Sequence, residues 1–166
     1  MIEIRRVGGE RRHDLAVTLA AAFAEDPFIG WLLAESPFEP AEAQLRWWTG
    51  ALAAMDQVAV LHATQDSSAV AVWVPPHDPG GEPGDGENDF VAFLHEVCGA
   101  GAEERLGFLA ELHAATPPEP HWHLTAVAVA PALQNQGMGR KVMAPQLDQC
   151  DRLGRPAYLE ATTSRS

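Results

Sequence analysis

The chain has 166 residues, of which 46% are hydrophobic and 20% are charged, a composition typical of one globular domain with a single core. Its 11 basic and 23 acidic residues give a net charge of −12, which disfavours nonspecific binding to nucleic acid or membrane. This charge would attract a cationic acceptor such as an amine, or it serves only to keep the protein in solution. No apolar run approaches the roughly 20 residues of a membrane-spanning helix, and the first residues do not resemble a secretory signal, so we expect a cytoplasmic protein.

The first half of the chain alternates between strand and helix patterns. Residues 2–7 predict a strand, and residues 13–24 predict an amphipathic helix. Asp26 followed by Pro27 is typical of a helix cap with proline at the first helical position, so a short helix is expected there. A further helix is predicted over 40–55, and strands over 58–63 and 69–74 form a predicted antiparallel hairpin.

The middle of the chain is predicted to be less regular. Residues 75–88 are dense in Pro, Gly, Asp and Glu, which indicates a solvent-exposed loop. Residues 90–98 and 103–115 have helical spacing, and the proline-rich residues 116–120 lead rigidly into the next element.

The second half is organised around residues 121–140. Residues 122–129 are β-branched and apolar, which predicts a mostly buried strand that ends before Pro131. A loop with two glycines follows, then an amphipathic helix as far as Leu153, and then a strand over 157–161. This order of elements predicts a right-handed crossover.

The glycine loop is suited to binding an anion. Gly137 and Gly139 stand at the start of the predicted helix, where unpaired N–H groups and the helix dipole favour negative charge. Without a Cβ, these residues let the backbone approach a phosphate closely, and Arg140 and Lys141 add positive charge. The spacing lacks both the third glycine of a dinucleotide-binding turn and the Lys-Ser/Thr of a P-loop, which excludes those two kinds of site.

Gln134, Gly137 and Gly139, preceded by Val129 and Pro131, resemble the pyrophosphate loop of the GNAT superfamily of acyl-CoA-dependent N-acyltransferases. Residues 20–24, 69–73, 118–122 and 158–162 are similar to the subgroup that contains puromycin N-acetyltransferase and its actinobacterial relatives. The resemblance implies a single mixed α+β domain over residues 1–166. Its central, mostly antiparallel sheet would be flanked by helices and splayed between the fourth and fifth strands.

The resemblance also implies acetyl-CoA as the co-substrate. The pantetheine arm would pair with the strand backbone, and the pyrophosphate would lie on the loop. The residues assigned to this site are Val127, Ala128, Val129, Gln134, Asn135, Gln136, Gly137, Met138, Gly139 and Arg140.

An amine must lose a proton to attack a thioester, so the site needs a base and an oxyanion donor, for which the amide of Val129 is expected. The candidate bases are Glu160, His123 and Asp26. Glu160 lies where many family members carry a functional glutamate, but it can equally be an ordinary strand carboxylate. His123 has a suitable ordinary pKa and, on an alternating strand, is expected to share a face with Val127; a partly wet strand-end histidine is the alternative. Asp26 is better explained as a helix cap.

The sequence predicts neither a metal site nor a disulfide. His121 and His123 lie two residues apart, but no further ligand accompanies them at a suitable spacing. Cys98 and Cys150 show no pairing pattern, and the position of Cys150 on an apolar helix face indicates packing.

The family pattern normally continues beyond residue 166 and includes a tyrosine that commonly protonates the departing thiolate, whereas Tyr158 is the only tyrosine here. The chain is therefore a fragment, or a second subunit covers its sheet edge in a homodimer, or it is natively short and impaired. The expected function is transfer of an acetyl group to a primary amine of a small molecule, such as an antibiotic or another natural product. The alternatives are a protein or peptide N-acetyltransferase and a truncated acyl-CoA-binding module with little turnover.

Overall fold

The computed structural model describes residues 2–76 and 86–163. Its strands form one sheet whose spatial order is also the chain order. Among the described strands, the first four pair antiparallel with one another in sequence order, and the fourth pairs parallel with the fifth. This is the mixed, mostly antiparallel sheet predicted from the sequence. The strands are β1 (Ile4–Val7), β2 (Val60–Thr64), β3 (Ala69–Val74), β4 (Trp122–Val129) and β5 (Ala157–Tyr158).

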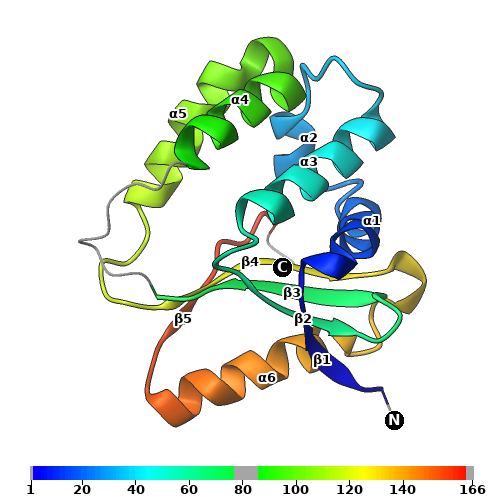
Figure 1. The fold of residues 1–166 in the computed structure, drawn as a ribbon, viewed down its shortest axis with the longest axis vertical. Helices are drawn as coiled ribbons and strands as arrows, with labels where there is room; N and C mark the ends of the chain where they lie inside the picture. The colour runs from blue at the N-terminus through cyan, green and yellow to red at the C-terminus, as the bar shows by residue number, and fades with distance from the viewer. Residues whose placement is uncertain (1, 77–85, 164–166) are drawn as a thin grey trace.

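Helices cover both faces of the sheet, as Figure 1 shows. One face carries α1 (Arg12–Ala22), α2 (Pro27–Leu32), α3 (Pro40–Ala54), α4 (Gly86–Cys98) and α5 (Ala102–Ala114). The other face carries α6 (Met138–Leu153), and short 3-10 turns occur at η1 (Gly9–Arg11), η2 (Gly99–Gly101) and η3 (Pro131–Leu133). Within the described ranges, no helix is long and apolar enough to cross a membrane.

Each face of the sheet has its own hydrophobic core. The larger core lies under α1 to α5 and includes Leu15, Leu19 and Trp48. The smaller core lies under α6 and includes Trp73 and Val142. Burying a side chain of this size stabilises the fold by about 1.5–3 kcal/mol, so these two layers fix the sheet between the helices.

Several predicted elements are confirmed, and the errors lie at element ends. β3 and β4 have the predicted bounds, whereas β2 begins at Val60 rather than at residue 58. The strand predicted over 157–161 is wrong beyond Tyr158, because β5 pairs with only two residues of β4. Of the loop predicted over 75–88, residues 77–85 lie outside the described chain, and residues 86–88 already belong to α4.

A β-bulge in β4 overturns one prediction about the central strand. Val72 pairs with Ala126 and the next residue, Trp73, pairs with Leu124, so Thr125 is an extra residue without a partner on β3. The bulge changes the alternation of side chains. Leu124 and Val127 therefore both pack on the α6 side, and His123 lies on the opposite face from Val127 rather than on the same face. The bulge thus turns His123 toward the helical layer.

Candidate functional site

The sheet opens between β4 and β5. Only Trp122 and His123 of β4 pair with β5, opposite Ala157 and Tyr158. From Leu124 to Val129, the edge of β4 that faces away from β3 has no strand partner among the described residues. An unpaired edge offers backbone N–H and C=O groups to an extended ligand, which can bind as an added strand.

The free edge presents the backbone of two predicted site residues. Ala130, next to the end of β4, donates its N–H to the Ser68 carbonyl on the β3 side over 2.8 Å. Because N–H and C=O groups alternate in direction along a strand, the backbone groups of Val129 and Val127 point to the open side. The backbone groups of Ala128 point toward β3, so they bond within the sheet and are not available to a ligand at the open edge.

The loop between β4 and α6 contains two residues with left-handed backbone. Asn135 and Gly137 both have left-handed conformations, with φ of 61° and 74°. Asparagine tolerates this region better than most residues, and glycine has no Cβ to oppose it. A Cβ added at Gly137 would meet no atom within 4 Å, and one at Gly139 would meet only Val129 Cγ2, at 3.9 Å. The space above both glycines is therefore open.

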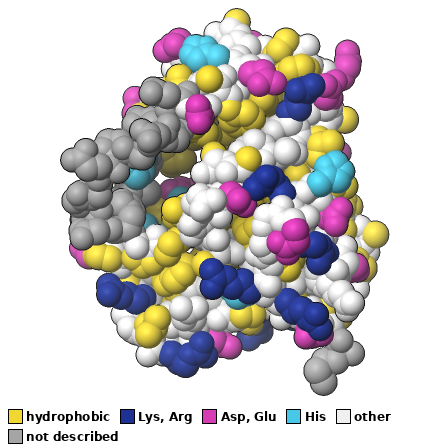
Figure 2. All heavy atoms as spheres, viewed as in Figure 1, with side chains coloured by type: hydrophobic (Ala, Val, Ile, Leu, Met, Phe, Trp, Pro, Cys, Tyr) yellow, Lys and Arg dark blue, Asp and Glu magenta, His cyan; other side chains and the backbone are white. Residues whose placement is uncertain are grey.

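The start of α6 provides unpaired donors and positive charge at this open space. Within the described chain, the N–H groups of Met138, Gly139 and Arg140 donate no hydrogen bond, and Lys141 is the first residue whose N–H bonds back, to Gly137. Met138 is buried in the smaller core, under α6. Arg140 and Lys141 are exposed, and Figure 2 shows Lys and Arg side chains concentrated over the half of the molecule that holds α6.

Two glutamines brace the loop. Gln134 donates its amide to the carbonyl of Val129 over 3.1 Å and so ties the loop to the end of β4. Gln136 donates to the carbonyl of Ala132 over 3.3 Å. Their side chains therefore shape the loop rather than point freely into the open space.

The two leading catalytic candidates form a pair. His123 Nε2 lies 2.7 Å from Glu160 Oε2, and the two side chains are only 30% and 24% exposed. The second oxygen, Oε1, is buried and has no partner that meets hydrogen-bond geometry in the described chain. If Nε2 carries the hydrogen and donates it to the carboxylate, Nδ1 has a free lone pair and can accept a proton.

Tyr158 and His121 surround this pair. The ring of Tyr158 lies 5.7 Å from that of His123 and 5.3 Å from that of His121. Loss of hydration and the neighbouring Glu160 carboxylate raise the pKa of the Tyr158 hydroxyl, which therefore stays protonated at neutral pH. His121 Nδ1 lies 2.8 Å from the carbonyl of Glu119.

A cavity of about 420 Å³ borders His123. It lies between the end of β3, the last turn of α5 and the proline-rich segment that precedes β4. Sequence reasoning treated this segment only as a rigid lead into β4, and no motif marked it as the wall of a cavity. The lining residues are Val74, Pro75, His113, Thr116, Pro117, Pro118, Glu119, Pro120, His121 and His123.

Comparison with known families decides what this arrangement is. The sequence model of the acetyltransferase (GNAT) family matches residues 80–165, which is 86 of the 166 residues. The chain belongs to the GNAT acetyltransferase family. It is thus an N-acetyltransferase that uses acetyl-CoA, as the resemblance of the glycine loop implied.

Solved structures share the fold of this GNAT acetyltransferase. Arylalkylamine N-acetyltransferase 2 from Aedes aegypti is similar with a TM-score of 0.66 and 13% identity. A Corynebacterium glutamicum protein described as histone acetyltransferase HPA2 and related acetyltransferase gives 0.62 and 20%, and the polyamine N-acetyltransferase of Drosophila melanogaster gives 0.60 and 18%. Each comparison covers 99% of this chain and 78% of the other. At these identities the likeness shows the fold alone.

The described residues fit acetyl-CoA. The open space above Gly137 and Gly139 leaves room for a phosphate group beside three unpaired N–H groups. The outward backbone groups of Val127 and the outward N–H of Val129 can receive an extended amide chain, whereas the Val129 carbonyl already accepts a hydrogen bond from Gln134. Arg140 and Lys141 supply charge opposite to that of phosphates. A GNAT-family protein described in complex with acetyl-CoA, from Brucella melitensis, shares the fold with a TM-score of 0.51, 15% identity and coverage of 99% of this chain and 78% of the other.

Asp26, the third candidate base of this GNAT acetyltransferase, accepts hydrogen bonds with both of its carboxylate oxygens. Its Oδ1 accepts hydrogen bonds from the N–H groups of Phe28 and Ile29, both at 3.0 Å, and so caps α2 as predicted. Its Oδ2 accepts a hydrogen bond from Thr162. Both carboxylate oxygens of Asp26 therefore take part in structural contacts, which favours His123 and Glu160 as the candidates for the base.

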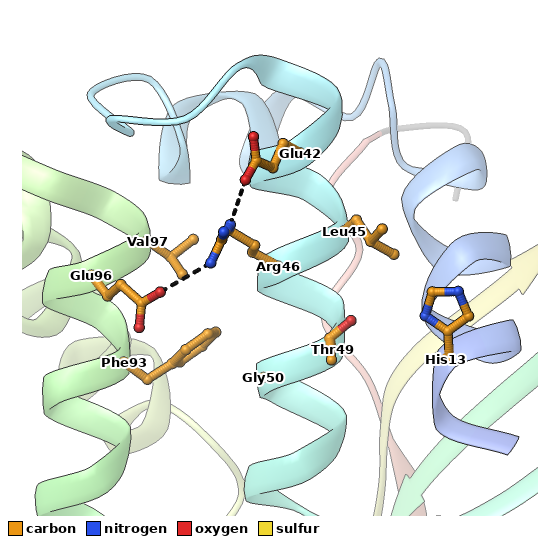
Figure 3. Close-up of a pocket in the computed structure, with 9 residues that line it drawn as sticks. All are labelled: His13, Glu42, Leu45, Arg46, Thr49, Gly50, Phe93, Glu96 and Val97. Atoms are coloured by element: carbon orange, nitrogen blue, oxygen red, sulfur yellow. Dashed lines mark hydrogen bonds and ion pairs between the residues drawn. The ribbon is translucent and has the colours of Figure 1, made fainter. Parts of the chain in front are cut away.

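A second cavity, of about 440 Å³, lies between α1, α3 and α4 and is drawn in Figure 3. Its charged groups bind one another: Arg46 contacts Glu42 at 2.9 Å and Glu96 at 3.2 Å. None of its lining residues belongs to the glycine loop, β4 or β5. It is therefore separate from the acetyl-CoA region.

Proposed function

We propose that this enzyme acetylates the primary amine of a small molecule, with His123 as the general base and Glu160 as its hydrogen-bonded partner. The 2.7 Å contact between the two side chains carries the proposal. Glu160 orients the imidazole, and His123 Nδ1 takes a proton from the acceptor amine, which can then attack. When bound, acetyl-CoA would supply the thioester carbon for this attack. The carbon–sulfur bond would break, and the second proton lost by the amine nitrogen would pass to the departing CoA sulfur, giving the amide and CoA thiol. The outward N–H of Val129 is suited to stabilise the oxygen of the intermediate.

The cavity beside His123 supports a small acceptor. Its volume of about 420 Å³ lies in the range of small-molecule pockets. The net charge of −12 favours a cationic amine. Two structural neighbours are named for arylalkylamine and polyamine acetylation, which agrees with this class of acceptor. The similarity to the puromycin N-acetyltransferase subgroup makes antibiotics and related natural products part of the proposal, and we propose the cytoplasm as the place of action.

The test is release of CoA thiol from acetyl-CoA with a panel of small amines and amine-bearing peptides. His123→Gln and Glu160→Gln should each lower kcat about 100-fold or more, as expected for loss of a general base, while the Kd of acetyl-CoA stays unchanged. The matched control is His95→Gln, because His95 lies on α4, is 47% exposed and pairs with Glu103. Wild-type kcat in both site variants would refute the assignment.

The amine panel separates the alternatives. Higher kcat/KM values for peptides than for small amines would favour a protein or peptide acetyltransferase. Tight binding of acetyl-CoA without turnover on any amine would favour an acyl-CoA-binding module.

A further inference from the structure

Glu160 stands on a segment without regular secondary structure. β5 ends at Tyr158, and residues 159–161 form neither strand nor helix. A segment outside the sheet lacks the regular ladder of hydrogen bonds that fixes the residues of a strand. The position of the Glu160 carboxylate therefore depends on individual side-chain contacts.

Two such contacts flank Glu160. The first is the 2.7 Å contact of its own carboxylate with His123. The second lies two residues further on, where the hydroxyl of Thr162 donates a hydrogen bond to Asp26 Oδ2. A hydrogen bond to an ionised carboxylate is roughly twice as strong as one between neutral groups. The Thr162 contact can therefore limit how far the segment moves away from His123.

Asp26 is held firmly enough to act as an anchor. Its Oδ1 receives the N–H groups of Phe28 and Ile29, and Pro27 restricts the backbone between cap and helix. α2 is in turn fixed to α5 by Arg105, whose Nη2 donates to the carbonyl of Trp31 over 3.0 Å. The Arg105 side chain is only 3% exposed. The Asp26 carboxylate thus has a fixed place in the helical layer, and Oδ2 is its oxygen left for Thr162.

We propose that Asp26 is a positioning residue that holds Glu160 against His123 through the hydroxyl of Thr162. This inference rests on the proposed function, because it assumes that the pair of His123 and Glu160 performs the proton transfer. Asp26 itself does not contact His123 or Glu160 in this arrangement. It links the turn between α1 and α2 to the segment that carries Glu160, and Figure 1 shows the chain after β5 turning back toward the helical layer.

Two substitutions remove the contact without removing the helix cap. Thr162→Val deletes the hydroxyl at nearly constant volume, and Thr162→Ser keeps the hydroxyl as the matched control. Asp26→Ser retains an oxygen that caps α2 about as well as aspartate, but the shorter side chain cannot also reach Thr162. The melting temperature of each variant should stay close to that of the wild type, which shows that the fold is intact.

The expected result is a fall in kcat of about tenfold for Thr162→Val and for Asp26→Ser, because a small displacement of a catalytic group has a large effect on rate. The Kd of acetyl-CoA should not change, and Thr162→Ser should restore most of the lost kcat. In the Glu160→Gln background, Thr162→Val should cause no further loss, because the contact acts through Glu160. A purely structural role would lower kcat by the same factor in both backgrounds.

The possible failures are distinguishable. Wild-type kcat in Thr162→Val, or an equal fold loss with and without Glu160, would overturn the positioning role while leaving the base assignment in place. Wild-type kcat in Glu160→Gln would refute the proposed role of Glu160, and the positioning role would fall with it.

Discussion

The ring of Phe93 on α4 lies where a side chain on Gly50 of α3 would begin. A Cβ built on Gly50 would stand 2.1 Å from Phe93 Cε2, far inside contact distance. The ring cannot move freely, because it also stacks on Trp47, with 5.8 Å between ring centroids. The absence of a side chain at Gly50 therefore lets α3 and α4 approach each other, and this contact forms one wall of the cavity in Figure 3.

Gly50→Ala should destabilise the fold by up to about 2 kcal/mol. Overpacking of about 1–3 kcal/mol opposes the gain of about 1 kcal/mol from replacing a helical glycine. The matched control is Gly107→Ala on α5, where an added Cβ meets nothing within 4 Å and the variant should be more stable by about 1 kcal/mol. Urea unfolding measures the change in the free energy of unfolding for each variant. Changes of the same sign in Gly50→Ala and Gly107→Ala would contradict the packing argument.

Arg105 should matter more to stability than Arg46, although each contacts two glutamates. The Arg105 side chain is 3% exposed, bonds the carbonyl of Trp31 and lies 4.7 Å over the Trp31 ring. Arg105→Met should cost about 2 kcal/mol or more, because it leaves a carbonyl without its donor and removes the cation–π contact. Arg46 is 43% exposed, so Arg46→Met should cost at most about 1 kcal/mol. Thermal unfolding compares the stability of the two variants. A larger loss of stability in Arg46→Met than in Arg105→Met would show that burial of the arginine does not determine its contribution.

The sequence predicted the elements of the fold but not all of their ends. Hydrophobic periodicity and proline breakers are local signals, and they located β3 and β4 correctly. The end of β5 at Tyr158 depends on where β4 and β5 separate, which is a property of pairing between distant segments. The bulge at Thr125 likewise depends on the partners Val72 and Trp73 and leaves no mark in the local pattern.

The sequence named the candidate site residues one by one, but it did not indicate which of them would lie in contact. In the glycine loop, Gly137 has a left-handed conformation, which a residue without a Cβ adopts readily. His123 and Glu160 were separate candidates, and their 2.7 Å contact arises because the bulge turns His123 to the face on which Glu160 lies. Asp26 and Thr162 lie 136 residues apart in the sequence, and a single sequence contains no signal that two such distant residues will be in contact.

Acid should weaken the fold through His62 on β2. Burial lowers the pKa of His62 below its ordinary value of 6.5, the amide of Gln146 opposes this shift, and the charge of Arg6 adds to it. A lowered pKa in the folded state means that the unfolded state binds the proton more tightly. Above pH 6.5, His62 is neutral in both states and does not change the free energy of unfolding. As the pH falls below 6.5, protonation of the unfolded state lowers the free energy of unfolding by at most about 1.4 kcal/mol per pH unit.

His62→Leu tests this dependence, because it removes the titrating group. Urea unfolding of both proteins at several pH values between 7.5 and 5 should show a smaller acid loss in the variant. His95→Gln, at an exposed position, controls for the general effect of losing a histidine. Parallel curves for wild type and His62→Leu would show that other groups cause the acid sensitivity.

Gly137→Glu should abolish binding of acetyl-CoA. Glutamate places bulk in the open space above the loop and a negative charge where phosphates are expected, and at φ of 74° it also strains the backbone by about 1–2 kcal/mol. Gly154→Glu is the matched control, because Gly154 ends the same helix with φ of 58° and an equally open Cβ position. It should suffer the same strain and still bind acetyl-CoA. Isothermal titration of acetyl-CoA into both variants separates backbone strain from obstruction of the phosphate site. Unchanged affinity in Gly137→Glu would refute the phosphate assignment. An equal loss of affinity in Gly154→Glu would attribute the effect to strain in the helix rather than to the ligand site.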